Sequence, residues 1–402
     1  MKTISVIIPT KDRPHHLYHT LQCLSEQTLR PELFEVIVIN DGGKNPETSI
    51  KYPFKISWIK TKGKGSKGPA TARNLGAEKA ENEILLFIGD DNFPNKYLLW
   101  FHNFKHCCHE EPIAIQGYID WHPDLMPDTF REFITGEGGF QFNWNSLKTE
   151  TGWKEKADGW FVTANVSIDK TAFLLEQGFN TKFKIAAWED IELGYRLTRK
   201  GIVTYFQPHA LVYHHHRITF NSFIERQYAA GRARIDLAAL QPELGIDLLA
   251  GILDSNNNYE EQLDLALVTN FNVDPEIQPL QKHRWGNVLH SAAIKGAYDE
   301  LNERGGLWSA VPHIKGSGNS KKALHCLIEA AHAFEDGNLG RATIELEWAM
   351  HYEQNSWAIY AALGELYAHQ KGNRLKAIQS FQKAIELDPN NSDWPAKRLQ
   401  TL

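Results

Sequence analysis

The first two hundred residues alternate between two spacings of apolar positions. Short, largely apolar runs predict five strands, at residues 5–8, 34–39, 56–59, 84–88 and 113–119. Between them, apolar or small residues recur at helical spacing, as in Leu17, Leu21 and Leu24 and in the segment PATARNLGAEKAEN that begins at Pro69. Strands that alternate with helices predict βαβ units and a mostly parallel sheet. The sequence therefore predicts an α/β fold here.

Polar side chains follow three of these predicted strands. Thr10 and Asp12 follow the first strand, Asp41 follows the second, and Asp90 and Asp91 follow the fourth. The carboxyl ends of neighbouring parallel strands form one edge of a sheet, and ligands bind at that edge. A turn would explain a single aspartate, because Asp and Asn are common where a strand becomes a loop. Acidic residues at three strand ends favour a ligand or metal site instead.

From about residue 221 the apolar pattern becomes helical. The segment FNSFIERQYAAGRARIDLAAL predicts a helix, and residues 250–320 are expected to alternate helical stretches with polar loops such as SNNN and KGSGNSKK. Near the C-terminus the spacing of small and large residues resembles a tetratricopeptide repeat, carried by Tyr360, Leu363, Gly364, Tyr367, Ala377, Phe381, Ala384 and Pro389. A weaker copy precedes it, with Gly337, Ala342, Leu346 and Ala349. An unrelated helical hairpin is the alternative.

Composition and charge narrow the class of protein. The formal net charge is -6, so no general attraction to nucleic acid or anionic lipid is expected. Four cysteines show neither metal-binding spacing nor disulfide density, which fits a reducing compartment. No apolar run is long enough for a signal peptide or a transmembrane helix. We therefore expect a cytoplasmic protein that does not bind nucleic acid. The basic stretch 226–234 is a candidate for peripheral membrane attachment.

Two later segments carry residues suited to catalysis or metal binding. WEDIELGYRL predicts a helix with Glu189 and Asp190 in its first turn, where carboxylates commonly interact with the helix dipole. Beside Trp188, one of them could serve as a general base in a partly apolar pocket. Three successive histidines follow a strand-like stretch, and alternation along a strand places His214 and His216 on the same face. Neutral imidazoles bind cations such as Mn²⁺, although a lone histidine is more often a packed core residue.

Aromatic residues and one basic loop complete the candidate site. Arg73 and Asn74 follow the Lys- and Gly-rich loop 60–67, and they could face a diphosphate. For the loop 60–67 itself, a surface segment without a ligand is the simpler interpretation. Seven aromatic side chains could stack on sugar rings, although about half of them are expected to lie in the core. They are Trp121, Phe140, Phe142, Trp144, Trp153, Trp160 and Trp188. Residues 120–157 are expected to face an acceptor and to close over a bound donor.

The order of these segments resembles glycosyltransferase family 2, which has the GT-A fold of nucleotide-sugar enzymes. The resemblance spans residues 3–235 and rests on SVIIPTKDR, VIVINDGG, GPATARNLG, ILLFIGDDNFP, GWFVTANVSIDK, WEDIELGYRL and VYHHHR, in that order. It departs from the family at Gly89, where many relatives have a third acidic residue. This departure leaves open which of Asp90 and Asp91 binds a metal.

The resemblance implies a role for each matching residue. Donor binding would fall to Pro9, Thr10, Asp12, Arg13, Asp41, Arg73, Asn74, Asp90, Asn165 and Trp160, with Asp41 accepting a hydrogen bond from the base. Mn²⁺ or Mg²⁺ would be held by Asp91, His214 and His216. Asp190 would be the catalytic base, and Glu189 would bind the acceptor or the sugar.

The family resemblance also implies a domain organisation and an activity. We expect a GT-A domain with a mostly parallel twisted sheet at residues 1–235, a helical linker region at 236–320 and tetratricopeptide-like repeats at 321–402. The expected activity is metal-dependent transfer of a sugar, with inversion, from a nucleotide-diphosphate sugar to a hydroxyl. The expected donor is a UDP-sugar, and the acceptor would be a glycan, a lipid-linked sugar or a protein. The alternatives are a retaining GT-A transferase, a nucleotidyltransferase or an inactive scaffold. The repeats would bind a protein partner or mediate self-association.

Overall fold

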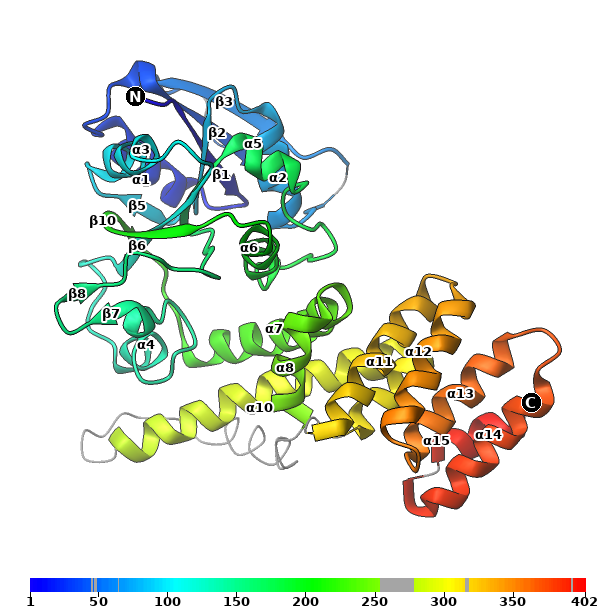
Figure 1. Ribbon diagram of the computed structural model, residues 1–402. Coiled ribbons are helices and arrows are strands. Elements are labelled where there is room, and N and C mark those ends of the chain that lie inside the picture. Colours follow the sequence, from blue (N-terminus) through cyan, green and yellow to red (C-terminus); the bar gives the residue numbers. More distant parts are fainter. Residues whose placement is uncertain (45, 47–48, 64, 254–277, 315–317, 392) are drawn as a thin grey trace. The chain divides into compact units, whose positions relative to one another are not determined.

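The structure is a computed structural model that describes residues 1–44, 46, 49–63, 65–253, 278–314, 318–391 and 393–402 (Figure 1). The chain divides into two compact units, Met1–Phe220 and Asn221–Leu402. The expected SNNN loop lies outside the described residues. The three-domain division predicted from the sequence stays a prediction, and helix α7 (Phe220–Leu240) runs through its boundary at residue 235.

The first unit is built on one open sheet of mixed direction. Its strands follow the order β3 (Lys55–Lys60), β2 (Phe34–Asn40), β1 (Ile4–Thr10), β4 (Ile84–Ile88), β9 (Asn165–Asp169), β6 (Ala114–Trp121), β10 (Thr204–His214) and β5 (Asn92–Pro94). The pairs from β3 to β4 and the pair β6–β10 are parallel, whereas β9 and β5 run antiparallel to their neighbours. A separate short hairpin joins β7 (Lys148–Thr149) to β8 (Gly152–Trp153). The predicted mostly parallel sheet is confirmed.

Helices cover both faces of this sheet (Figure 1). Alternate residues of β1 point to opposite sides, so Ile4, Val6 and Ile8 share one apolar core and Ile7 belongs to the other. The first core includes α1 (Pro14–Ser25) and α3 (Leu98–Cys107), and the second includes α2 (Pro69–Lys79), α5 (Lys170–Leu175) and α6 (Glu189–Arg199). Helix α4 (Thr129–Thr135) and the 3-10 turns Pro31–Leu33 and Trp144–Leu147 complete the unit.

The second unit is helical throughout its described residues. Its elements are α7, α8 (Pro242–Leu253), α10 (Gln278–Arg304), the 3-10 helices Gly306–His313 and Pro389–Asn391, α11 (Gly318–Glu335), α12 (Leu339–Tyr352), α13 (Trp357–His369), α14 (Arg374–Leu387) and α15 (Asp393–Thr401). Helices α11 and α12 pack together, as do α13 and α14. The expected KGSGNSKK loop is wrong in its second half, because α11 already begins at Gly318 and includes the residues after it.

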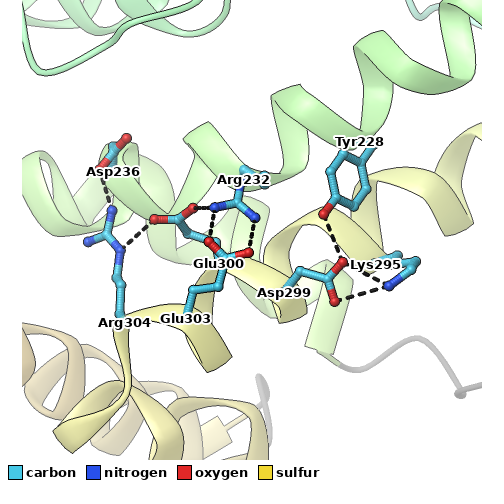
Figure 2. A network of polar contacts seen from close by, with 8 residues as sticks. All are labelled: Tyr228, Arg232, Asp236, Lys295, Asp299, Glu300, Glu303 and Arg304. Carbon is cyan, nitrogen blue, oxygen red and sulfur yellow. Dashed lines mark hydrogen bonds and ion pairs between the residues drawn. The ribbon is translucent and has the colours of Figure 1, made fainter.

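Helices α7 and α10 are held together by a tight crossing and a polar network. A Cβ atom at Gly231 would lie 2.0 Å from the Ala293 carbonyl oxygen, and one at Gly296 would lie 2.0 Å from the Tyr228 carbonyl oxygen. Only glycine permits so close an approach of two backbones. Figure 2 shows the ion pairs and hydrogen bonds that accompany the crossing, made by Tyr228, Arg232, Asp236, Lys295, Asp299, Glu300, Glu303 and Arg304.

No helix among the described residues is both long enough and apolar enough to cross a membrane.

Candidate active site

The ends of neighbouring strands bring a hydroxyl and two carboxylates together. Thr10, the last residue of β1, donates a hydrogen bond from Oγ1 to Asp90 Oδ2 at 2.7 Å, just beyond β4. Thr20 of α1 donates to the Asp90 backbone oxygen at 2.8 Å. Asp90 and Asp91 are 5% and 7% exposed. The structure thus brings the predicted Thr10 and Asp90 together at this edge, and Thr20 joins them although its helical position gave no such signal.

The pairing of β10 with β5 places the histidines beside Asp91. In this antiparallel register His214 lies opposite Asn92, directly after the two aspartates. His214 Nδ1 lies 3.6 Å from Asp91 Oδ1, and His216 Nδ1 lies 3.4 Å from Asp91 Oδ2. The two imidazoles stack at 5.6 Å, while His215 stacks on Phe93 instead. The prediction that His214 and His216 share a face is confirmed.

Asn92 determines which nitrogen of His214 carries the proton. Its Nδ2 donates to the Ala164 backbone oxygen at 2.7 Å, so its Oδ1 must face His214 Nδ1, also at 2.7 Å. An amide oxygen only accepts, and therefore Nδ1 of His214 is the protonated atom. In the neutral ring Nε2 then carries the lone pair, which is the arrangement that metal-binding histidines adopt.

Arg13 places a cation against both aspartates. Its Nη1 lies 2.6 Å from Asp91 Oδ2 and 3.5 Å from Asp90 Oδ1. Burial alone would raise the pKa of Asp91, but the hydrogen bond to His216 and the charges of His214 and Arg13 hold it well below its usual range. Burial and the charge of Asp91 raise the pKa of Asp90 to about 6, against the opposing effects of Thr10 and Arg13. The two neighbouring carboxyls thus differ strongly in acidity.

An open cavity of about 490 Å³ lies next to this cluster. It is lined by Thr10, Asp12, Arg13, Pro14, His15, Leu17, Lys44 and Pro46. Asp12 adopts a positive φ of 56°, and its Oδ1 accepts a hydrogen bond from the Lys44 backbone N–H at 3.0 Å. Three predicted donor-binding residues therefore line one cavity. Pro9, half-buried, is next to them in β1. Lys44 was not among the predicted residues.

Asp41 is buried and accepts four hydrogen bonds. Its Oδ1 accepts from Thr61 Oγ1 and the Lys67 backbone N–H, and its Oδ2 accepts from Ser66 Oγ and the Gly68 backbone N–H, all within 3.0 Å. These contacts fasten the Lys- and Gly-rich loop, and with it the start of α2, to the end of β2. The predicted hydrogen bond from a nucleotide base to Asp41 stays a prediction.

The first turn of α6 contains a buried carboxylate and a more accessible one. Glu189 is 2% exposed, and its Oε1 accepts a hydrogen bond from Arg73 Nη1 at 2.8 Å. Burial and the neighbouring Asp190 raise the pKa of Glu189 to about 7, while Arg73 opposes the rise. Asp190 is half-buried, and its Oδ2 accepts a hydrogen bond from the Thr163 backbone N–H at 3.4 Å. The low solvent access expected for a base beside Trp188 is thus found at Glu189.

Several side chains predicted to bind the donor are in contact with other residues of this protein. Asn74 donates to the Phe179 carbonyl and accepts from the Phe179 N–H, at 2.8 and 2.9 Å. Asn165 is fully buried; its amide donates to the carbonyls of Tyr118 and Ala210, and its oxygen contacts His102. Trp160 stacks on Trp144 at 5.0 Å. Direct contact of these residues with a donor stays a prediction.

Gly89 is too crowded for the third acidic residue that the family resemblance leads one to expect. A Cβ atom at this position would lie 2.9 Å from Asp91 Oδ1 and 3.1 Å from Asn92 Nδ2. A side chain here would therefore displace the carboxylate of Asp91. The departure from the family pattern has a physical reason in this chain.

Two aromatic residues next to His214 complete the cluster. Trp121 lies 5.3 Å from the His214 ring, and Phe142 meets the same ring edge-on at 5.6 Å. Phe142 has a positive φ of 47°, which is uncommon for a bulky residue. The sequence grouped both with the possible sugar-stacking aromatics but gave no sign that they contact His214.

The described residues contain no group of three or more His, Cys, Asp or Glu side chains that is already arranged to hold a metal ion. Asp91, His214 and His216 are nevertheless neighbours, and they offer the carboxylate and imidazole ligands that suit Mn²⁺. The guanidinium of Arg13 contacts Asp91 where a cation would otherwise be attracted.

Comparisons with known proteins point to glycosyltransferases. Residues 5–107 match the family described as "Glycosyl transferase family 2". Chondroitin synthase from Pasteurella multocida is 28% identical over 240 residues, which are 52% of this chain and 24% of that protein. Validoxylamine A glucosyltransferase from Streptomyces hygroscopicus subsp. limoneus is 26% identical over 234 residues, 50% of this chain and 48% of that protein. The N-terminal unit thus contains a glycosyltransferase family 2 domain, and the chain spans less than half the length of these relatives.

Similarity to solved structures is more distant. The mannosyltransferase PcManGT from Pyrobaculum calidifontis, solved in complex with GDP-Man and Mn²⁺, aligns with a TM-score of 0.43 and 14% identity, covering 92% of this chain and 88% of that one.

Proposed function

We propose that the N-terminal unit is a GT-A glycosyltransferase that transfers a sugar from a nucleotide-diphosphate sugar to a hydroxyl, with inversion of the anomeric centre. The proposed donor is a UDP-sugar. The observation that carries the proposal is the cluster of Thr10, Arg13, Asp90, Asp91 and His214 beside one cavity, on a glycosyltransferase family 2 domain. A cluster of charged and titratable groups next to a cavity at the carboxyl edge of strands is the usual form of an α/β active site.

In this proposal the nucleotide occupies the cavity lined by Thr10, Asp12 and Lys44. Its size suits a nucleoside, because ligand cavities commonly measure about 300–1,000 Å³. Arg13 lines the cavity and also contacts the aspartates, so its guanidinium is positioned to hydrogen-bond a phosphate oxygen. Asp41 would read the base, and this requires that one of its contacts with residues 61–68 be exchanged for the ligand.

Asp91, His214 and His216 fit a divalent cation by their chemistry. Asp91 is ionised over the whole neutral range, and the tautomer of His214 leaves the Nε2 lone pair for a ligand bond. A bound Mn²⁺ or Mg²⁺ would offset the negative charge of the diphosphate leaving group. Arg13 would have to leave Asp91 to admit it.

Asp190 is the proposed catalytic base. It is more accessible than Glu189, and its carboxylate is oriented by the Thr163 and Ile191 backbone N–H groups. It would take the proton from the acceptor hydroxyl as that oxygen bonds to the anomeric carbon and the bond from this carbon to the diphosphate breaks. Attack from the side opposite the leaving group inverts the anomeric centre. Glu189, Trp160 and Asn165 would lie around the sugar and acceptor.

The stereochemistry of the product tests this mechanism. The chain is incubated with UDP-, GDP- and dTDP-sugars without an acceptor, so that water replaces the hydroxyl, and proton NMR records the first anomer released. An α-linked donor should give the β-sugar, and Asp190→Asn should lower the rate on the order of 100-fold or more. The exposed Asp336→Ala serves as control. Release of the α-anomer would contradict inversion and favour the retaining alternative.

We also propose that helices α11 to α14 form two tetratricopeptide-like repeats. Supporting this, Ala342, Ala377 and Ala384 are buried, and a Cβ at Gly364 would lie 2.7 Å from the Phe381 ring. Their proposed role is self-association or binding of a protein partner. Analytical ultracentrifugation of the full chain over a hundred-fold concentration range tests the first of these, and a concentration-independent monomer would contradict it.

A further inference from the structure

A buried ion pair joins α2 to the first turn of α6. Arg73 and Glu189 are 116 positions apart in the chain, and their contact at 2.8 Å is made by side chains that are 9% and 2% exposed. Burying two charges costs free energy that is recovered only when the pair is well placed and hydrogen-bonded. A pair this deep therefore fixes the two helices relative to each other at this point.

The pair is incompletely hydrogen-bonded. Within the described part of the chain, Glu189 Oε2 and Arg73 Nε are both buried without a hydrogen-bond partner. A bidentate pair, with two parallel hydrogen bonds, would have engaged both carboxylate oxygens of Glu189. Much of the mutual stabilisation therefore comes from charge, so the contact weakens if Glu189 becomes neutral.

The turn that this pair holds is the one that carries Asp190. Trp188, directly before Glu189, has a positive φ of 70°, a conformation that costs free energy for a residue with a side chain. Of the acidic residues in this turn, Glu189 pairs with Arg73 and Glu192 pairs with Arg196. No cation pairs with Asp190 in the described structure. The position of Asp190 thus depends on its neighbours.

We infer that Arg73 is a positioning residue that acts on Asp190 through Glu189, rather than a group that binds the donor diphosphate. The inference rests on the proposed function, in which Asp190 is the base. With Glu189 ionised, Arg73 holds the first turn of α6 so that Asp190 faces the acceptor. With Glu189 neutral, the charge of Arg73 is left buried and uncompensated, and the turn is held less firmly.

This dependence on charge gives the inference a pH signature. The charged groups that face Glu189 are Arg73 from α2 and Asp190 from its own helix. Since burial and Asp190 raise the pKa of Glu189 to about 7, the pair loses its charge as the pH falls through that value. Removing Arg73 removes a group that lowers this pKa, so the Glu189 carboxyl should then titrate at higher pH, while the activity step that depends on the pair should disappear.

Two variants test the pH signature in donor hydrolysis by the full chain. Arg73→Gln should lower kcat at pH 7 on the order of 10- to 100-fold, leave the donor KM within about three-fold and lack the acid-side step, because no ion pair remains to lose its charge. Glu189→Gln should lack the step and remain near the wild-type rate on its acid side. Arg73→Lys should restore part of kcat, and the exposed Arg199→Gln on α6 is the matched control.

Two further readouts separate this inference from the proposed function. Carboxyl-¹³C NMR, with Glu189→Gln to assign the resonance, should show Glu189 titrating near 7 whether or not any nucleotide binds. Calorimetric nucleotide affinity should be unchanged in Arg73→Gln. A ten-fold loss of that affinity, together with a pH step that persists in Arg73→Gln, would overturn the inference and return Arg73 to the donor. Failure of the wild type to bind any nucleotide would instead count against the proposed function.

Discussion

At the scale of single residues, unusual backbone conformations mark the candidate site. The non-glycine residues with positive φ among those described are Asp12, Phe142, Gln177 and Trp188. Asp12 lines the cavity, Phe142 contacts His214, and Trp188 precedes Glu189. Such conformations cost about 1–3 kcal/mol each and persist where the surroundings impose them, most often at functional sites. Three of the four occur at the site for which we propose a function.

A methyl group at Gly89 should disturb this site without unfolding the chain. In Gly89→Ala the new Cβ would lie 2.9 Å from Asp91 Oδ1, so the carboxylate must move. We expect metal-dependent nucleotide affinity to fall on the order of 10-fold or more, since one displaced ligand suffices. Calorimetry measures the affinity. Gly340→Ala, where a Cβ meets no atom closer than 3.8 Å, should leave it unchanged. Equal affinity in both variants would show that Asp91 does not bind the metal.

Burial of Glu189 should make stability depend on pH. Its pKa rises on folding from 4.5 to about 7, so between these values the folded state binds more protons than the unfolded state. Stability from this group therefore falls as the pH rises through that window, by at most about 1.4 kcal/mol per pH unit. Urea unfolding of wild type and Glu189→Gln at several pH values measures it. The free energy of unfolding of the wild type should fall more steeply with rising pH than that of Glu189→Gln. Parallel curves would contradict the raised pKa of Glu189.

At the scale of elements, a strand could be predicted from the sequence where it forms an apolar run. Most residues of strands β1, β2, β3, β4 and β6 are buried or half-buried, and all five strands were predicted. Strands β9 and β5 were not predicted. The first is five residues long and includes the polar Asn165 and Ser167, and the second has three residues. Their antiparallel pairing depends on partners far along the chain, which local patterns do not encode.

The crossing of α7 and α10 gives a prediction at this scale. Gly231→Ala and Gly296→Ala each place a Cβ 2.0 Å from a carbonyl oxygen of the other helix, so the helices must separate. Overpacking of this kind typically costs about 1–3 kcal/mol. Urea unfolding should show the loss in both variants. Gly251→Ala, whose Cβ meets no atom within 4 Å, is the control and should not be destabilised. No loss in either variant would mean that the helices do not cross here.

At the scale of the whole molecule, the proposed chemistry resides in one unit. The two apolar cores around the sheet use only residues before 221, and the helical core uses only residues after it. Each unit therefore has a core of its own, as an independently folding domain does. The site residues that we propose all belong to Met1–Phe220.

Residues 1–220 alone should therefore fold and retain the nucleotide site. We expect a cooperative unfolding transition and a nucleotide affinity within about three-fold of the full chain, because the cavity and Asp91 lie inside this unit. Calorimetry on both proteins makes the comparison. A folded fragment that has lost the affinity would show that the helical unit contributes to the donor site.

The site illustrates how far a sequence alone can go. The residues at strand ends were predictable, because parallel strands place their carboxyl ends at one edge. Contacts such as that of Asn74 with Phe179, 105 positions away, were not. They arise from the packing of α2 against later segments, and no local pattern specifies them. Motifs thus indicated the residues that we propose for the site, but not the long-range contacts that hold them.

The central claim is a metal-dependent nucleotide site at Asp91. Its most direct test is calorimetric binding of UDP, GDP and dTDP, with and without Mn²⁺, to the wild type and to Asp91→Ala. We predict that one nucleotide binds tightly and that its binding requires both Mn²⁺ and Asp91, with a loss of at least about 10-fold when either is absent. If no nucleotide binds, or if binding needs neither the metal nor Asp91, the account of this site is wrong.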